Sequence, residues 1–189
     1  MRLLLHTCCA PCAIYPVREA KKDNYVVTGF FYNPNIHPYS EYIRRRREAE
    51  IYFKSEGLEL LVPEYDTDDF FKNIRTSRCG VCRNIRLEKT ASFAKEKGFD
   101  SFTTTLLGSP YQDHNPLTEL CENLSKGTGL NLYYKDFRIG FGDAHKAARE
   151  KGMYCQNYCG CVFSMVEREE ARKVKTRSQS HKVTSRVTL

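Results

Sequence analysis

The sequence predicts an α/β fold: an open parallel five-stranded sheet with helices on both faces, in a single domain. Short apolar runs alternate along the chain with segments of helical period, and this alternation is typical of parallel sheets. Polar and cysteine-rich segments follow the apolar runs, as expected if a site lies at the carboxyl ends of strands. The 189 residues, 41% of them hydrophobic, suffice for one core and require no second domain.

The first predicted strand is the apolar run Leu3–Leu5, which suits a strand covered on both faces. A helix should follow and begin between Pro11 and Pro16, because proline lacks an N–H and is tolerated only in the first turn of a helix. Three cysteines, at positions 8, 9 and 12, then fall in the loop between strand and helix. A helix N-terminus stabilises anions, thiolates included, so the candidate site begins at Cys8.

The remaining elements continue the alternation. Further strands are expected at residues 25–32, 58–62, 101–107 and 130–137. Helices are expected at residues 39–56, from an acidic turn to residue 74, at 79–97, from 117, at 144–151 and from 162. In the helix at residues 39–56, Arg44–Arg47 should cross the side that faces solvent. Gly140 and Gly142 should form a turn before the helix at 144–151.

A polar loop, residues 108–116, ends the fourth predicted strand on the same side of the sheet as Cys8. Its residues Tyr111 and Asp113, with His114, are candidate proton donors, although polar residues between prolines also serve as turn residues. Two other residues are expected in the core. His6 ends a buried strand, and Cys121 shares helical spacing with neighbouring leucines.

Nine cysteines in this chain favour metal binding or redox chemistry. The short apolar run at the start is no export signal, and no later stretch could span a membrane. We therefore expect a cytoplasmic protein in a reducing environment, where clustered cysteines seldom form structural disulfides.

Eight of the cysteines remain once Cys121 is set aside, which exceeds the four ligands of a structural zinc site and favours an iron–sulfur cluster. The predicted cluster ligands are the adjacent pair Cys8 and Cys9 and the spaced pair Cys79 and Cys82. A second pair, Cys159 and Cys161, has two interpretations that spacing leaves open. It holds a second metal, with Cys12 as a further ligand, or it cycles between dithiol and disulfide.

Basic residues occur at two places of interest. Arg75, Arg78, Arg83 and Arg86 surround the Cys79 pair and either offset thiolate charge, grip phosphate or form a solvated helix face. Residues 171–189 form a basic tail without acids, either a solvated end that frays or an arm attracted to a polyanion such as tRNA. The positive residues of this tail are Arg172, Lys173, Lys175, Arg177, Lys182 and Arg186. The rest of the chain, residues 1–170, is the predicted iron–sulfur domain.

Four segments together carry a resemblance: HTCCAPC, CGVC followed by arginine, TTTLLGSPYQ and YCQNYCGCVFS. Over residues 3–165 the chain resembles the cobalamin-independent epoxyqueuosine reductases. The resemblance implies an adenine-nucleotide α-hydrolase-like, Rossmann-like domain with a [4Fe-4S] cluster and a nearby mononuclear iron or redox-active cysteine pair. It also implies the last step of queuosine biosynthesis, on tRNA carrying epoxyqueuosine at the wobble position. Cys155 stands where the family usually has arginine, so it should not be an essential ligand.

Conversion of the epoxide to the cyclopentene consumes two electrons and two protons, and the electron donor is unidentified. An iron could polarise the C–O bond while Cys159 and Cys161 bind it or hold reducing equivalents. Exposed aromatic residues could hold the single-stranded loop of the substrate: Tyr15, Tyr39 and Tyr158. Two rivals are a non-catalytic iron–sulfur sensor or tRNA-binding module, and a tRNA-thiolating enzyme of the same fold. A thiolating enzyme would need a glycine-rich phosphate loop after the first strand, and this chain has none there, because no glycine precedes Gly29.

Overall fold

Five parallel strands form the sheet in the computed structural model, in the order β3-β2-β1-β4-β5. The structure describes residues 1–74 and 78–184; for residues 175–184 it describes the backbone only. In the central strand, Leu5 pairs with Gly29 on one side and Thr103 on the other. This sheet confirms the predicted Rossmann-like α/β class. The strands are β1 (Arg2–His6), β2 (Val26–Phe30), β3 (Glu59–Leu61), β4 (Ser101–Thr104) and β5 (Asn131–Leu132).

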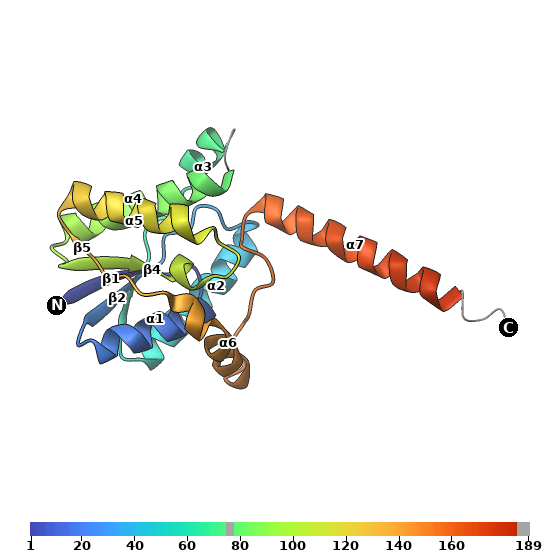
Figure 1. Cartoon of the computed structure of the whole chain (residues 1–189), viewed down its shortest axis with the longest axis horizontal. Coiled ribbons are helices and arrows are strands. Elements are labelled where there is room, and N and C mark those ends of the chain that lie inside the picture. The colour runs from blue at the N-terminus through green and yellow to red at the C-terminus, as the bar shows by residue number, and fades with distance from the viewer. Residues whose placement is uncertain (75–77, 185–189) are drawn as a thin grey trace.

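Helices cover both faces of the sheet (Figure 1). On one face α1 (Ala10–Lys22) packs against α2 (Tyr39–Ser55) and α6 (Phe141–Glu150). On the other, α4 (Arg78–Glu96) packs against α5 (His114–Thr128), and the short helix α3 (Asp68–Asn73) contacts α4.

The three leucines of β1 belong to two different core clusters. Leu3 and Leu5 join the cluster that includes Ala13 and Val17 of α1, whereas Leu4 joins the cluster that includes Ala91 of α4. Successive strand residues point to opposite faces, so all three leucines are buried only because both faces are covered. The apolar run therefore predicted the central strand correctly.

Helix α1 differs from the expectation in its start and in one proline. It begins at Ala10, one residue before the expected range, and Pro16 lies inside it. Proline at this position leaves the Cys12 carbonyl without its usual helical N–H donor. Pro16 is buried among the helices and strands of this face, and this packing stabilises the helix in spite of the missing bond.

The last two strands are shorter than expected. After Thr104 the chain turns into a 3₁₀ helix, Thr105–Gly108, because the Thr104 hydroxyl accepts a hydrogen bond from the Leu106 N–H at 3.1 Å. Strand β5 ends at Leu132, residues 133–136 have no regular secondary structure, and a second 3₁₀ helix, Phe137–Gly140, follows. Gly142 lies inside α6 and forms no turn there. Short strands bring the following loops directly to the carboxyl edge of the sheet.

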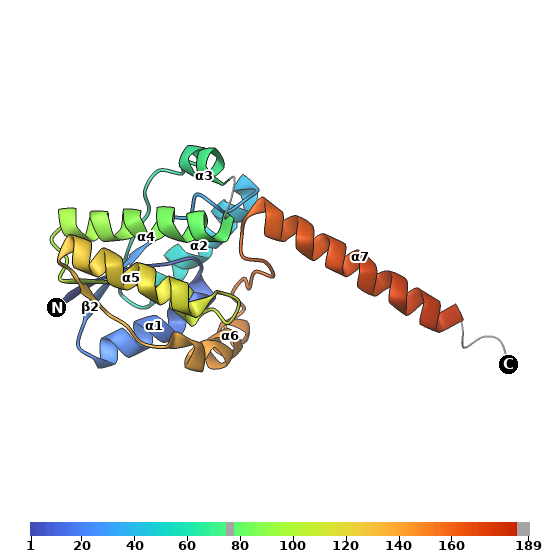
Figure 2. The ribbon, with the colours of Figure 1, turned by 45° about the horizontal axis from the view of Figure 1, so that its top comes forward.

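The last helix, α7 (Val162–Thr184), projects away from the rest of the molecule (Figure 2). The predicted division at residue 170 falls inside this helix, whose backbone is helical up to residue 184. Separation of a domain from a tail at that point stays a prediction. None of the helices in the described part of the chain has both the length and the apolar character that crossing a membrane requires.

Candidate metal centre

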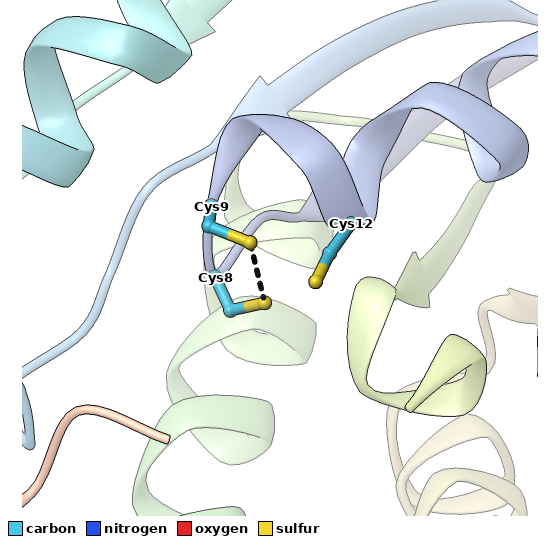
Figure 3. Close-up of side chains that lie close together, drawn as sticks. All are labelled: Cys8, Cys9 and Cys12. Atoms are coloured by element: carbon cyan, nitrogen blue, oxygen red, sulfur yellow. Dashed lines mark hydrogen bonds between the residues drawn. The ribbon is translucent and has the colours of Figure 1, made fainter. Parts of the chain in front are cut away.

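Three cysteines meet where β1 ends and α1 begins. Cys8 follows the strand, Cys9 is the N-cap of α1, and Cys12 lies in its first turn. Their sulfur atoms lie within 4.8 Å of one another, with 3.7 Å between those of Cys8 and Cys9. Figure 3 shows the three thiols pointing toward one common space. We call this group the thiol triad.

The thiol triad favours one thiolate beside two thiols. Hydrogen bonds with the Cys12 and Cys9 thiols lower the pKa of Cys8, and the Arg86 cation contributes. Burial raises the pKa of Cys9, and the bond with Cys8 raises that of Cys12. Deprotonation of all three at once therefore requires additional positive charge, such as a metal ion.

Arg86 is buried beside the triad without a carboxylate. It donates to His6 Nε2 at 3.3 Å and to Asn33 Oδ1 at 2.7 Å, and its Nη1 lies 3.9 Å from the Cys82 sulfur. No partner of this cation in the described chain is a carboxylate. Since an unpaired buried charge is costly, cysteine thiolates are its natural counter-ions, and its charge lowers the pKa of Cys8.

The arginines around Cys79 have different roles. The Arg86 guanidinium lies 3.9 Å from the Cys82 sulfur, and its role in offsetting thiolate charge stays a prediction. Arg83 donates to the Asp113 carbonyl, and Arg78 pairs with Glu167 on α7. Arg75 lies outside the described residues.

The second cysteine pair, Cys159 and Cys161, lies just before α7 with its sulfurs 3.8 Å apart. All nine cysteines are free thiols, so the described chain contains no disulfide. A hydrogen bond with Cys161 lowers the pKa of Cys159 to about 5, and one with Ser164 adds to this effect. The same bond raises the pKa of Cys161. The pair is thus a thiolate beside a thiol.

Buried Arg45 holds this loop. Its guanidinium donates to the Cys159 carbonyl at 3.0 Å and to the Tyr158 carbonyl at 3.1 Å, and its Nε pairs with Glu41 at 2.7 Å. The expectation that Arg44–Arg47 all face solvent is wrong for Arg45, which is 1% exposed. The docked loop covers this side of α2, which helical spacing alone could not reveal.

Gly160, between the two cysteines, contributes a second anchor. Its carbonyl accepts from the His37 N–H at 2.8 Å. Its φ of +127° is a conformation that side chains disfavour, and a Cβ there would lie 3.0 Å from Ile36. Glycine is therefore required at this point in the loop.

The Cys79 and Cys82 pair lies near the start of α4, with Cys79 in its first turn and Cys82 in the next. Burial raises the pKa of Cys82, and the charges of Cys159 and Cys79 act on it as well, whereas Cys79 is exposed. The structure groups Cys8 and Cys9 with Cys12 and places neither Cys79 nor Cys82 in that group. The four-cysteine ligand set chosen from spacing stays a prediction.

Several other predicted residues have defined positions. His6 is a core histidine as predicted: its Nδ1 lies 2.8 Å from Thr104 Oγ1, and burial lowers its pKa to about 3. Cys121 is fully buried, also as predicted. Tyr111 is 86% exposed, and Asp113 is the N-cap of α5. Roles of Tyr111 and Asp113 as proton donors stay predictions.

Two residues that the sequence analysis did not identify lie at the triad. The Gln156 amide nitrogen is 2.8 Å from the Cys9 sulfur. His145 lines a small cavity with Cys12 and Tyr15, and its Nε2 is buried without a partner in the described chain. Only the cysteines flanking Gln156 hinted at its place, and nothing in the α6 sequence pointed to His145.

Comparisons with known proteins agree on one family. A family model described as epoxyqueuosine reductase QueH matches residues 3–167. The epoxyqueuosine reductase QueH of Dehalococcoides mccartyi is 36% identical over 171 residues, covering 88% of this chain and 94% of the relative. The epoxyqueuosine reductase QueH of Thermotoga maritima is 34% identical over 195 residues, covering 95% of this chain and 98% of the relative.

A solved structure supports the fold. The predicted subunit of tRNA methyltransferase from Methanocaldococcus jannaschii matches with a TM-score of 0.55 at 16% identity, covering 79% of this chain and 76% of that one. At this identity the similarity concerns the fold alone.

Proposed function

Because the chain belongs to the epoxyqueuosine reductase QueH family, we propose that it reduces epoxyqueuosine to queuosine at the wobble position of tRNA. The observation that carries this proposal is the thiol triad at the carboxyl end of the central strand, next to a buried arginine. Three thiols and a buried cation that has no carboxylate partner in the described chain lie together at one place. A redox metal centre explains both.

The residues fit an iron–sulfur centre. Iron–sulfur clusters are held by thiolates, and here cysteines surround a common space. Arg86 and Arg45 act electrostatically on the thiols and so offset the negative charge of thiolate ligands. We propose a [4Fe-4S] cluster and an additional mononuclear iron, which when bound supply single electrons and a Lewis acid for the epoxide oxygen. Cys8 and Cys9 are ligands in this proposal, completed by Cys79 and Cys82 or by Cys12.

Cys159 and Cys161 have two proposed roles. As iron ligands they hold the second metal, with Cys12 as a further ligand. As a redox pair, the dithiol gives up two electrons and two protons and becomes a disulfide. The reaction consumes the same two electrons and two protons: the two C–O bonds of the epoxide break, the alkene forms and the oxygen leaves as water. An external electron donor then restores the dithiol.

Other residues of the chain serve binding and proton transfer in this proposal. Tyr111 and Asp113 stand on the loop after β4 and are proposed to deliver protons to the leaving oxygen. Tyr39, 58% exposed, can stack on an unpaired base of the anticodon loop. The projecting helix α7 contains residues 171–184 of the basic tail, which is proposed to add attraction to the tRNA backbone.

Iron and sulfide analysis of the anaerobically purified protein tests the proposal. We expect about four acid-labile sulfides per chain and more irons than sulfides. Incubation with a strong reductant and epoxyqueuosine tRNA should yield queuosine, measured by mass analysis of digested nucleosides. Zinc alone without sulfide, or no queuosine from a fully loaded protein, would refute it.

Cysteine variants separate the two ligand sets. Cys79→Ala should lose the cluster if spacing predicted the ligands correctly, and Cys12→Ala should lose it if the triad forms the site. Cys121→Ala, which removes a core thiol on α5, is the control and should retain iron and sulfide. Cys159→Ser should keep the cluster absorption and tRNA binding yet form no queuosine.

A further inference from the structure

Gln156 reaches the thiol triad from a distant part of the chain. It lies in the segment between α6 and α7, and its amide nitrogen is 2.8 Å from the Cys9 sulfur and 3.9 Å from that of Cys12. The Cys9 side chain it contacts is only 1% exposed. The amide thus covers two of the three thiols.

We propose that Gln156 is a positioning residue that donates its amide N–H to the Cys9 sulfur in the iron-loaded protein and raises the reduction potential of the centre. This inference rests on the proposed function, because it requires Cys9 to hold iron. The ligand sulfur is then a thiolate, which has no proton to donate. Only the N–H end of the amide can face it favourably.

A hydrogen bond to a ligand sulfur acts differently on the two oxidation states. The reduced centre carries one more negative charge, so an N–H donor stabilises it more than the oxidised centre. The neutral amide of Gln156 adds no charge, and its effect comes from this single directed bond. Loss of the bond therefore makes the centre harder to reduce.

The other end of the amide argues against a role in packing alone. Gln156 Oε1 is buried and has no hydrogen-bond partner among the described residues. A buried acceptor without a partner is destabilising, and an apolar side chain of similar size would avoid that cost. Cys9 is also the N-cap of α1, so the contact ties the 151–161 segment to the start of the helix that presents the triad.

Redox titration of the anaerobically loaded protein, followed by electron paramagnetic resonance, tests the inference. Gln156→Leu removes the donor, and Gln156→Glu keeps the shape but places a carboxylate oxygen against the sulfur. We expect both variants to have a lower midpoint potential than the wild type, with the larger shift in Gln156→Glu. Asn157→Leu is the matched control, because Asn157 is the exposed neighbour in the same segment, and its potential should not change.

The outcomes distinguish this inference from the proposed function. Wild-type protein without iron and sulfide would refute both. A loaded wild type with unchanged midpoint potential in Gln156→Leu and Gln156→Glu would overturn the inference and leave the proposed function standing. If Gln156→Leu fails to retain iron, the potential of the more conservative Gln156→Glu variant decides.

Discussion

Arg45→Met should destabilise the protein strongly, because Arg45 and Glu41 form a shielded ion pair. Their side chains are 1% and 10% exposed, and Arg45 also binds the carbonyls of Tyr158 and Cys159. The substitution leaves the Glu41 carboxylate with the Tyr154 hydroxyl as its remaining hydrogen-bond donor in the described chain. Removing one partner of a buried ion pair costs about 3–5 kcal/mol of unfolding free energy.

Urea unfolding of the metal-free protein, followed by circular dichroism, measures this loss without a contribution from metal binding. With a slope of about 2 kcal/mol per molar urea, the midpoint should fall by about 2 M. The matched control is Arg46→Met on the same helix. Its partner Glu50 is also one turn away at 2.7 Å, but the two side chains are 41% and 43% exposed. Such a pair contributes about 0.5 kcal/mol or less.

A second variant checks the cause. Glu41→Gln added to Arg45→Met removes the stranded carboxylate, so the double variant should be more stable than Arg45→Met alone by about 1 kcal/mol or more. Equal losses in Arg45→Met and Arg46→Met would refute the reasoning, since burial would then not determine the cost.

Three further predictions concern the cysteine loop and the tail. Gly160→Ala forces an alanine to φ +127° against Ile36 and should lower the unfolding free energy by about 1–3 kcal/mol; Gly127→Ala, in open space on α5, should raise it by up to about 1 kcal/mol. A neutral or stabilising Gly160→Ala would contradict the proposed conformation. In the metal-free protein, alkylation of Cys159 by iodoacetamide should rise as the pH passes about 5 and then level off, whereas in urea it should rise near pH 8.5. Because the pKa of Cys159 is lower in the folded than in the unfolded protein, its ionisation stabilises the fold fully at pH values above the unfolded pKa, and this contribution is lost as the pH falls through about 5. An alkylation midpoint near pH 8.5 in the folded protein would rule out the lowered pKa. Truncation after Ala171 should weaken tRNA binding and its salt dependence, and an unchanged salt slope would exclude the tail from binding.

Local sequence patterns were sufficient for the framework of the fold. The apolar run at Leu3–Leu5 predicted a strand buried on both faces, and helical spacing placed Cys121 in the core. The same reasoning brought Cys8, Cys9 and Cys12 to the junction of strand and helix, where the thiol triad lies. These inferences succeed because backbone periodicity and the strand-to-helix junction involve residues close together in the chain.

Tertiary structure decided which distant residues complete the site. Arg45 contacts Cys159 across 114 positions of sequence, and Gln156 contacts Cys9 across 147. Helical spacing predicted Arg45 in solvent, and only the docked Cys159–Cys161 loop buries it. Likewise the grouping of Cys12 with Cys8 and Cys9 depends on side-chain directions at the start of α1, which spacing does not specify. Burial and pKa depend on which surfaces meet in three dimensions, so these properties of the site emerge only when the chain is folded.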